Sequence, residues 1–332
     1  MAPPPRNSRR VTAAMVAERA GTSIATVSLV VNGKDRGRVS IPIATRVRDA
    51  VEELGYVVDH AASSLARGSG DLVVLIAPDL SNPFFAEVIR GVRDTVGDRF
   101  QLVLSVTERG AQPVDADVRR FERLRPAGIL VDAPAAGESM SASVPVVLLD
   151  APGGADAVNY DLSSGVSALV AHLAAAGHRR VAYLDGTSRA TTFAVRRSLF
   201  EDACTAAGIT VSRTRAQADL TIDAAAAAVD GVVDDWLAEG VTAVVAAADT
   251  LAYGVLRVAG ARGVAVPGGL AVAGFDDLPS SSVTAPALTS VALPGADLGR
   301  AAALRLLATL DGTSAPSPAL PTRLIPRAST GA

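Results

Sequence analysis

The sequence predicts an all-α helix-turn-helix headpiece followed by a large α/β region, and three observations lead to this fold class. The first sixty residues contain short helix patterns that end at glycines. The rest of the chain alternates buried strand patterns with helix patterns, which is typical of parallel sheets. At 332 residues, the chain exceeds the usual size of one domain. Its composition, 49% hydrophobic and 20% charged, is that of a globular protein.

Charge is distributed unevenly along the chain. Residues 1–70 contain ten Lys or Arg and six Asp or Glu, whereas the remainder contains 21 and 28. A basic segment on an acidic body suggests that the N-terminal part meets a polyanion such as DNA. The lone Cys204 excludes an internal disulfide, and the three histidines lack metal-ligand spacing, so we expect neither a metal nor a cofactor.

The start of the chain does not have the pattern of a secretory signal peptide. Residues 1–10 are rich in Pro and Arg without an apolar core, so we expect a flexible arm. No run of about 18 apolar residues is free of charges and helix breakers, so no membrane span is expected. A cytoplasmic location is the resulting expectation.

Two short helices are predicted after the arm. Thr12 can cap a helix over residues 13–20, which Gly21 ends because glycine enters the left-handed conformation cheaply. Ser23 can cap a second helix over residues 24–31. Two short helices joined by a glycine-containing turn describe a helix-turn-helix.

A third helix and a small core complete the predicted headpiece. Ser40 can cap a helix that ends near Leu54, with Pro42 tolerated in the first turn. The expected core consists of Val16, Ala20, Val27 and either Val30 or Val31. The second helix then exposes Ile24, Ala25, Ser28 and Leu29.

The region from residue 71 onward predicts two Rossmann-like lobes with parallel sheets, because its strands are too many for one ordinary sheet. Strands are expected at 71–78, 101–106, 128–133, 144–150, 181–186, 218–222, 243–248, 269–276 and 322–326. Helices are expected at 84–96, 115–124, 163–176, 192–207, 224–239, 251–261 and 296–310. Ligands in such folds bind at the carboxyl ends of strands, here in the cleft between the lobes.

Several motifs carry a family resemblance. VT…VAERAGTS, ATVSLVVNG and VS…TRVRDAVEELGYV, within residues 11–58, resemble the DNA-binding headpiece of the LacI family of bacterial repressors. DHAASSLAR resembles the hinge of that family, which forms a helix when two subunits lie side by side on an operator. DLSNPFFAEVIRGV, GHRRVAYLDG, VRRSLFEDACTAAGI and LAVAGFDDLP resemble its periplasmic-binding-protein-like core.

The resemblance implies a domain layout. It predicts an arm at 1–10, the headpiece at 11–58, a hinge at 59–70 and an effector-binding and dimerisation domain at 71–332. Lobe 1 is expected at about 71–162 and 294–320, and lobe 2 at about 163–293 and 321–330, with three strands crossing between them.

The resemblance also implies DNA-contacting residues. Positions that mostly touch the DNA backbone in this family are occupied by Thr12, Ser23, Thr26, Ser28 and Asn32. Leu65 matches the hinge leucine that wedges into the minor groove. The base-reading positions hold Ile24, Ala25 and Leu29, where the family often has polar or arginine side chains. Such apolar residues can pack on thymine methyl groups but cannot form bidentate hydrogen bonds to bases.

Effector-binding residues follow from the resemblance one at a time. Phe85 matches a position that stacks on the ligand, Arg196 one that donates hydrogen bonds, and Asp276 one that accepts them. Asp150 follows a strand at the cleft, and Asp249 follows Ala248, where the family often has a ligand-binding asparagine. A salt bridge or a helix cap is the alternative role for each charged residue, and Asp277 is expected to be structural.

These inferences define the expected function. We expect a homodimeric transcriptional regulator, a repressor, that binds a pseudo-palindromic operator and responds to a carbohydrate-like effector in the cleft. An activator or an effector-independent regulator is the alternative. An enzyme is disfavoured, because the chain has no GxGxxG after the first strand, no GxxxxGK[ST] and no GxSxG.

Overall fold

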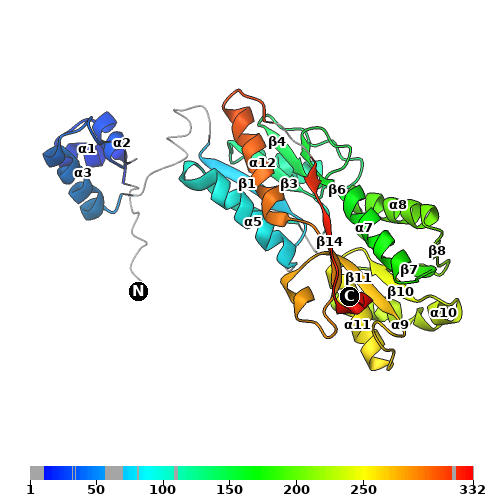
Figure 1. The fold of residues 1–332 in the computed structure, drawn as a ribbon. Helices are drawn as coiled ribbons and strands as arrows, with labels where there is room; N and C mark the ends of the chain where they lie inside the picture. The colour runs from blue at the N-terminus through cyan, green and yellow to red at the C-terminus, as the bar shows by residue number, and fades with distance from the viewer. Residues whose placement is uncertain are drawn as a thin grey trace, which may run out of the picture. The chain divides into compact units, whose positions relative to one another are not determined.

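A computed structural model describes residues 11–31, 33, 35–56, 70–80, 82–107, 111–315 and 319–331 of the chain. It divides into two compact units, residues 1–70 and 71–332 (Figure 1). The first is the helical headpiece, and the second contains the parallel sheets. Both parts of the predicted fold class are therefore confirmed.

The headpiece has three helices, α1 (Ala13–Ala20), α2 (Ile24–Val31) and α3 (Ile41–Leu54). The Thr12 hydroxyl accepts a hydrogen bond from the Met15 N–H, and Gly21 ends α1 with φ 63°. At α3 the prediction of a side-chain cap was wrong, because Ser40 is the N-cap residue but its hydroxyl makes no capping bond. Pro42 occupies the first turn and has no N–H to offer that hydroxyl.

Small aliphatic side chains form the headpiece core. All three helices contribute, since the buried residues are Val16, Ala17, Ala20, Val27, Val30, Ala44, Val47 and Ala50. Of the two alternatives left open by the sequence, Val30 is buried and Val31 only half-buried. A core built from alanine and valine buries little apolar surface, so this unit gains limited stability from packing.

Lobe 1 of the larger unit is a five-stranded parallel sheet with the order β2-β1-β3-β4-β5. Its strands are β1 (Leu72–Ala77), β2 (Gln101–Val106), β3 (Gly128–Asp132), β4 (Val146–Leu149) and β5 (Ala157–Val158). Side chains alternate between its two faces. Val73 and Leu75 belong to the core that includes α5 (Pro83–Val96) and α12 (Gly295–Leu310). Val74 and Ile76 pack with α6 (Asp115–Glu122).

Lobe 2 is a larger sheet with the order β14-β12-β11-β10-β7-β8, in which β9 also pairs with β7. Its strands are β7 (Arg180–Gly186), β8 (Thr210–Val211), β9 (Ala216–Ala218), β10 (Ala243–Ala246), β11 (Ala271–Asp276), β12 (Thr289–Ala292) and β14 (Arg323–Ile325). All pairings are parallel except that of β12 with β14.

Helices cover both faces of the lobe 2 sheet (Figure 1). On one side α7 (Leu162–Ala175) packs against α8 (Thr191–Ala206). On the other, α9 (Ile222–Asp230) packs against α11 (Asp249–Ala261), and the short α10 (Val233–Ala238) follows α9. The strand ends that carry the cleft residues are thus held by a core on each side.

The chain passes between the lobes three times. These passages lie between β5 and α7, between β12 and α12, and between α12 and β14. At two of them, β6 (Tyr160–Asp161) and β13 (Leu320–Pro321) pair in parallel. The two lobes are therefore linked covalently at three separate points.

Some predicted elements differ from the structure. The helix expected over 224–239 is two helices, because the backbone leaves helical geometry at Val232, with φ −132°. The strand expected at 218–222 ends at Ala218, since Thr221 caps α9 through its side chain. The strands β8 and β12 were not predicted, and both are short, with polar residues among the apolar ones.

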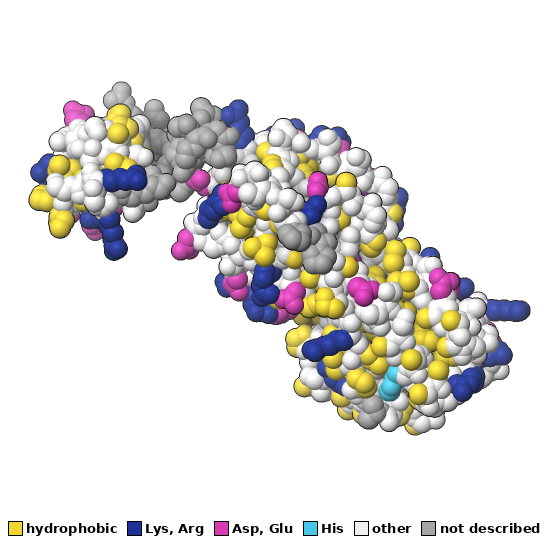
Figure 2. Space-filling model, turned by 45° about the horizontal axis from the view of Figure 1, so that its top comes forward, with side chains coloured by type: hydrophobic (Ala, Val, Ile, Leu, Met, Phe, Trp, Pro, Cys, Tyr) yellow, Lys and Arg dark blue, Asp and Glu magenta, His cyan; other side chains and the backbone are white. Residues whose placement is uncertain are grey.

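No single described helix is both long and apolar enough to cross a membrane. The pair α1 and α2 passes such a test only jointly, and the two helices are bent by 101°. On the larger unit, Figure 2 shows Arg side chains intermixed with Asp and Glu. Surface pairs such as Arg99–Asp311 and Arg305–Asp156 account for part of this mixing.

Candidate functional site: recognition helix and inter-lobe cleft

The start of α2 presents apolar side chains to solvent. Ile24 is 55% exposed, and Ala25 and Ser28 are exposed as well. Leu29 is half-buried. The Ser23 hydroxyl fixes this end of the helix by accepting a hydrogen bond from the Thr26 N–H at 3.1 Å. These residues form one face of a short, capped helix, which is the arrangement a recognition helix requires.

The other predicted DNA-contacting residues are small hydroxyl side chains near helix starts. Thr12 is exposed and caps α1, and the Thr26 hydroxyl lies 2.9 Å from that of Ser23. Helix starts with exposed N–H groups and hydroxyls suit contact with phosphates. Asn32 and Leu65, together with most of the predicted hinge, lie outside the described residues.

Three headpiece arginines are engaged within the unit. Arg19 pairs with Glu53 at 2.6 Å, and Arg48 pairs with Asp35 at 2.5 Å. The Arg46 Nε donates to the Ala20 carbonyl oxygen at 3.2 Å. These three arginines therefore have partners within the headpiece itself and are less available to contact DNA phosphates.

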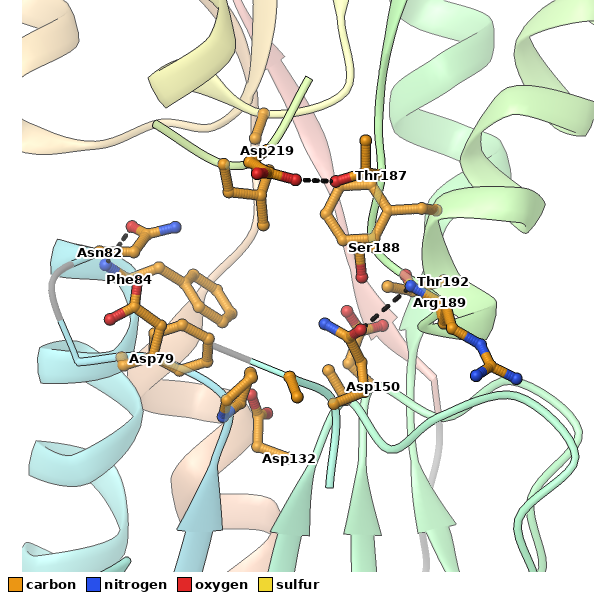
Figure 3. Close-up of a pocket in the computed structure, with 18 of the residues that line it drawn as sticks. Asp79, Asn82, Phe84, Asp132, Asp150, Thr187, Ser188, Arg189, Thr192 and Asp219 are labelled. Carbon is orange, nitrogen blue, oxygen red and sulfur yellow. Dashed lines mark hydrogen bonds between the residues drawn. The ribbon is translucent and has the colours of Figure 1, made fainter. Parts of the chain in front are cut away.

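A cavity of about 580 Å³ lies between the two lobes at the carboxyl ends of their strands (Figure 3). From lobe 1, β3 contributes Asp132 at its last position, and Asp150 directly follows β4. From lobe 2, Thr187 directly follows β7, and Asp276 is the last residue of β11. This is where ligands bind in doubly wound α/β folds.

Four of the five predicted effector residues line this cavity, namely Phe85, Asp150, Arg196 and Asp276. Phe85 packs edge-to-face on Phe84, with ring centroids 5.5 Å apart. Together with Phe193, these rings give the cavity three aromatic surfaces. Sequence reasoning named only Phe85, because which aromatic rings face the cavity depends on how the lobes pack.

Arg196 is the central cation of the cavity. It is 4% exposed, and its Nη2 and Nη1 lie 3.5 Å from Asp150 Oδ2 and Asp276 Oδ1. Its Nη1 also donates to the Ala247 carbonyl oxygen at 3.0 Å. Arg196 therefore links a carboxylate of lobe 1 to one of lobe 2.

Asp132 is a cavity residue that the sequence reasoning missed. It is 1% exposed, and burial raises the pKa of its carboxyl well above the usual range, with the nearby Asp150 charge adding to the effect. Like Asp150, it stands at the carboxyl end of a lobe 1 strand, and that shared position was the signal that could have revealed it.

Strained backbone gathers at the same strand ends. Ala133, Asp150, Asp276 and Asp277 have φ values of 42°, 48°, 104° and 55°, a region that residues other than glycine rarely adopt. Such strain persists where the surrounding fold enforces it, and it is common at binding sites. Burial raises the pKa of Asp276 to about 8, although the Arg196 charge opposes the shift.

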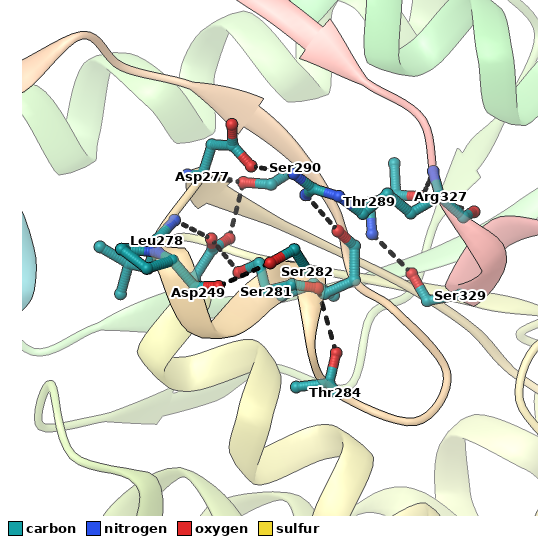
Figure 4. Close-up of polar contacts among 12 residues, drawn as sticks. Asp249, Asp277, Leu278, Ser281, Ser282, Thr284, Thr289, Ser290, Arg327 and Ser329 are labelled. Atoms are coloured by element: carbon teal, nitrogen blue, oxygen red, sulfur yellow. Dashed lines mark hydrogen bonds and ion pairs between the residues drawn. The ribbon is translucent and has the colours of Figure 1, made fainter.

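Asp249, the fifth predicted effector residue, does not line the cavity. Its Oδ2 accepts hydrogen bonds from the Leu278 N–H at 2.9 Å and the Ser281 hydroxyl at 2.6 Å, and its Oδ1 accepts one from Ser290 at 2.7 Å (Figure 4). A Cβ at Gly274 would lie 2.3 Å from Oδ1, so only glycine leaves room for this carboxylate. Asp249 anchors the segment that follows Asp276.

Asp277 pairs with Arg327 at 2.6 Å, which agrees with the structural role expected for it. It follows Asp276 directly, and the Ser290 hydroxyl accepts a hydrogen bond from its N–H at 3.0 Å. Asp249 and Asp277 together hold the strained turn at the end of β11 from its far side.

The lobes also touch at the edge of the cavity. The Arg189 N–H of lobe 2 donates to Gln112 Oε1 of lobe 1 at 3.1 Å, and the Ala136 N–H donates back to the Arg189 carbonyl oxygen at 3.0 Å. An isolated bridge pairs Ala135 with Ala190 beside them. These contacts join the lobes at the rim of the cleft, in addition to the Arg196–Asp150 pair inside it.

A helix-turn-helix unit joined to a two-lobed α/β unit with a polar cleft defines a class of DNA-binding regulators. The lacI family of bacterial regulatory proteins matches residues 12–59, and a periplasmic binding protein-like domain matches residues 170–330. The chain belongs to the LacI family, and it is a DNA-binding transcriptional regulator. The recognition made from the sequence is confirmed.

Curated relatives match over nearly the whole chain. The HTH-type transcriptional regulator GntR of Pseudomonas aeruginosa is 32% identical, covering 92% of this chain and 91% of the relative. The HTH-type transcriptional regulator CelR of Thermobifida fusca is 32% identical, with coverages of 92% and 93%. Catabolite control protein A of Priestia megaterium is 31% identical, with coverages of 88% and 90%.

Solved structures agree with these relatives. A lac repressor dimer bound to operator and the anti-inducer ONPF is 26% identical, with a TM-score of 0.84, and covers 98% of this chain and 100% of that one. A complex of the transcriptional regulator CelR with cellobiose is 29% identical, with a TM-score of 0.70 and coverages of 96% and 100%.

Proposed function

We propose that the protein is a homodimeric repressor that binds a pseudo-palindromic operator and releases or engages it when a carbohydrate occupies the inter-lobe cleft. The observation that carries the effector proposal is the cavity of about 580 Å³, which joins buried carboxylates and a buried arginine to aromatic rings. The dimeric lac repressor structure on operator supports the proposed assembly.

A carbohydrate suits the chemistry of the cavity walls. Carboxylates such as Asp150 and Asp276 accept hydrogen bonds from sugar hydroxyls, and Arg196 can donate to ring or hydroxyl oxygens. The aromatic rings of Phe84, Phe85 and Phe193 can pack against the apolar faces of sugar rings. The cellobiose complex of CelR is a relative with such a ligand.

We also propose that the headpiece reads DNA largely through apolar contacts and DNA shape. Ile24, Ala25 and Leu29 offer thymine methyl contacts instead of bidentate hydrogen bonds. Phosphate contacts from Thr12, Ser23, Thr26, Ser28 and Asn32 would fix the register, and Leu65 would insert at the centre of the site.

The proposal also includes that the protein is a regulator and not an enzyme, and that it acts in the cytoplasm, where operator DNA is found. Its support is that the curated relatives are named as regulators of transcription. The carboxylates of the cleft then serve recognition and not acid–base chemistry.

Operator selection from random DNA, with and without a carbohydrate panel, tests the proposal. The expected result is a pseudo-palindromic consensus whose enrichment changes with one class of carbohydrate. Selection of a consensus that no compound alters would favour an effector-independent regulator. Absence of any sequence-selective binding would contradict the proposal as a whole.

A further inference from the structure

On the cavity floor, the buried acidic groups outnumber the buried basic ones. Three carboxyl groups, those of Asp132, Asp150 and Asp276, surround the single guanidinium group of Arg196. Asp132 and Asp150 are 1% and 4% exposed, and the Asp276 side chain is 7% exposed. Fully buried carboxylates are unfavourable unless they are paired with cations or hydrogen-bonded.

Arg196 pairs only weakly with these carboxyl groups. Its 3.5 Å distances to Asp150 and Asp276 are longer than the roughly 2.7–2.9 Å of a strong charge-assisted hydrogen bond. One of its nitrogens is also used on a backbone carbonyl oxygen, that of Ala247. Asp132 forms no ion pair within the described part of the chain.

Two carboxylate oxygens on this floor have no hydrogen-bond partner among the described residues. They are Asp132 Oδ1 and Asp150 Oδ1, and both belong to side chains that line the cavity (Figure 3). Burial raises the pKa of both carboxyl groups. Without a further cation these raised pKa values favour the protonated carboxyl groups, and a ligand that brings hydrogen-bond donors and positive charge would favour the ionised form.

The rest of the lining does not supply that cation. Of the lining residues, five are Asp and two are Arg, and the second arginine, Arg189, is exposed, with its guanidinium pointing away from Asp132 in Figure 3. No described group of three or more His, Cys, Asp or Glu side chains is arranged to hold a metal ion. An organic cation fits these facts better than a metal.

We propose that the preferred ligand of the cleft carries a protonated amine on a hydroxyl-bearing scaffold, as amino sugars and aminocyclitols do, with the ammonium group against Asp132 and Asp150. The inference rests on the proposed effector role of the cleft and narrows its ligand class. An ammonium group donates three hydrogen bonds and carries the missing charge. Phosphorylated and carboxylated sugars are repelled by the same carboxylates.

Matched compounds that differ at a single group test this inference. The probes are glucosamine against glucose and N-acetylglucosamine, and tris(hydroxymethyl)aminomethane against pentaerythritol, its near-isosteric neutral counterpart. Binding to the full chain is measured by calorimetry and by the shift in melting temperature at constant ionic strength. We expect each amine to bind at least about tenfold more tightly than its neutral partner, as one charge-assisted hydrogen bond would give.

The variant Asp132→Asn isolates the carboxylate responsible. Asparagine keeps the shape but removes the charge, so the ratio of amine affinity to neutral-partner affinity should fall about tenfold. Asp98→Asn is the matched control, because it removes one negative charge from an exposed position in the same lobe that does not line the cavity.

The outcomes separate this inference from the proposed function. Equal or tighter binding of glucose or pentaerythritol would overturn the amine preference while leaving a carbohydrate effector in place. Tighter binding of N-acetylglucosamine than of glucosamine would do the same. If none of these compounds binds, the proposed amine preference is wrong. The effector role itself is tested separately by the operator selection with a carbohydrate panel. The wild-type comparison decides even if Asp132→Asn does not fold.

Discussion

Asp276 lies at the end of β11, where burial raises the pKa of its carboxyl to about 8 while the nearby Arg196 lowers it. An unfolded aspartate has a pKa of about 3.9, so the folded state binds this proton more tightly than the unfolded state does. The stability that this difference contributes is fully present below about pH 4 and is lost as pH rises through about 8. The buried Asp132 and Asp150, whose pKa values are also raised, act in the same direction.

The corresponding prediction concerns Asp276→Asn. The free energy of unfolding of the wild-type chain should fall between about pH 4 and pH 8, the window set by the unfolded and folded pKa values of Asp276. In the variant, which cannot titrate at this position, the fall should be smaller. Denaturant unfolding at several pH values measures both slopes, with Asp98→Asn as the control. Identical slopes in the wild type and Asp276→Asn would show that Asp276 is ionised normally.

Residue roles were predictable where a side chain stands in a recognisable motif. Phe85, Arg196 and Asp276 were placed at the cleft in this way, and Asp150 by its position after a strand. Asp132 was missed because its importance depends on β3 lying beside β4 in the sheet. Asp249 was expected in the cleft, but the space left by Gly274 draws its carboxylate behind the turn instead.

At the scale of elements, α5 and α12 approach each other through glycines. A Cβ on Gly91 would lie 2.0 Å from the Ala296 carbonyl oxygen, and one on Gly299 would lie 2.1 Å from that of Val88. Helix backbones can approach this closely only where side chains are absent from the contact. This packing joins the first helix of lobe 1 to the helix that returns to it after lobe 2.

Gly91→Ala is therefore expected to destabilise the larger unit by about 1–3 kcal/mol, because the helices must separate to admit the methyl group. Gly260→Ala is the matched control, since Gly260 lies in α11 and a Cβ there would meet no neighbouring atom within 4 Å. At that position alanine should stabilise by about 0.5–1 kcal/mol through its better helix propensity. Chemical denaturation measures both, and an unchanged stability of Gly91→Ala would refute the close contact.

The recognition helix α2 carries a second prediction at this scale. Alanine or serine replacements at Ile24 and Leu29 should relax base preference in the half-site, because thymine methyl contacts are lost. The slope of operator affinity against salt concentration should stay unchanged, because phosphate contacts are retained. Binding to a set of single-base operator variants at several salt concentrations measures both. An unchanged base preference would contradict the prediction, because it would mean that residues other than Ile24 and Leu29 recognise the bases.

Hydrophobic periodicity in the sequence predicted which helices and strands exist, whereas where each one ends depended on caps, glycines and neighbouring strands. The headpiece helices, with their capping serine and threonine and their glycine stops, were predicted with their bounds. The break between α9 and α10 was not predicted, because a run of alanines and valines fits one long helix and Gly231 alone interrupts it. The short β8 and β12 gain their stability from neighbouring strands and not from their own residues.

For the whole molecule, regulation by a ligand requires that the cleft and the operator act on one conformational equilibrium. Arg196 bridges carboxylates of both lobes, and Gln112 contacts Arg189 across the rim, so a ligand among these residues changes how the lobes meet. Any ligand that binds one lobe arrangement more tightly shifts the protein toward it. The coupling free energy between two sites acts equally in both directions.

Reciprocal titration tests this claim most directly. Operator affinity of the full chain is measured with and without a saturating cleft ligand, and ligand affinity with and without operator. We predict that both affinities change by the same factor, about 5- to 150-fold, and that Arg196→Ala removes the ligand effect while unliganded operator binding persists. A ligand that fills the cleft yet leaves operator affinity unchanged would contradict the account.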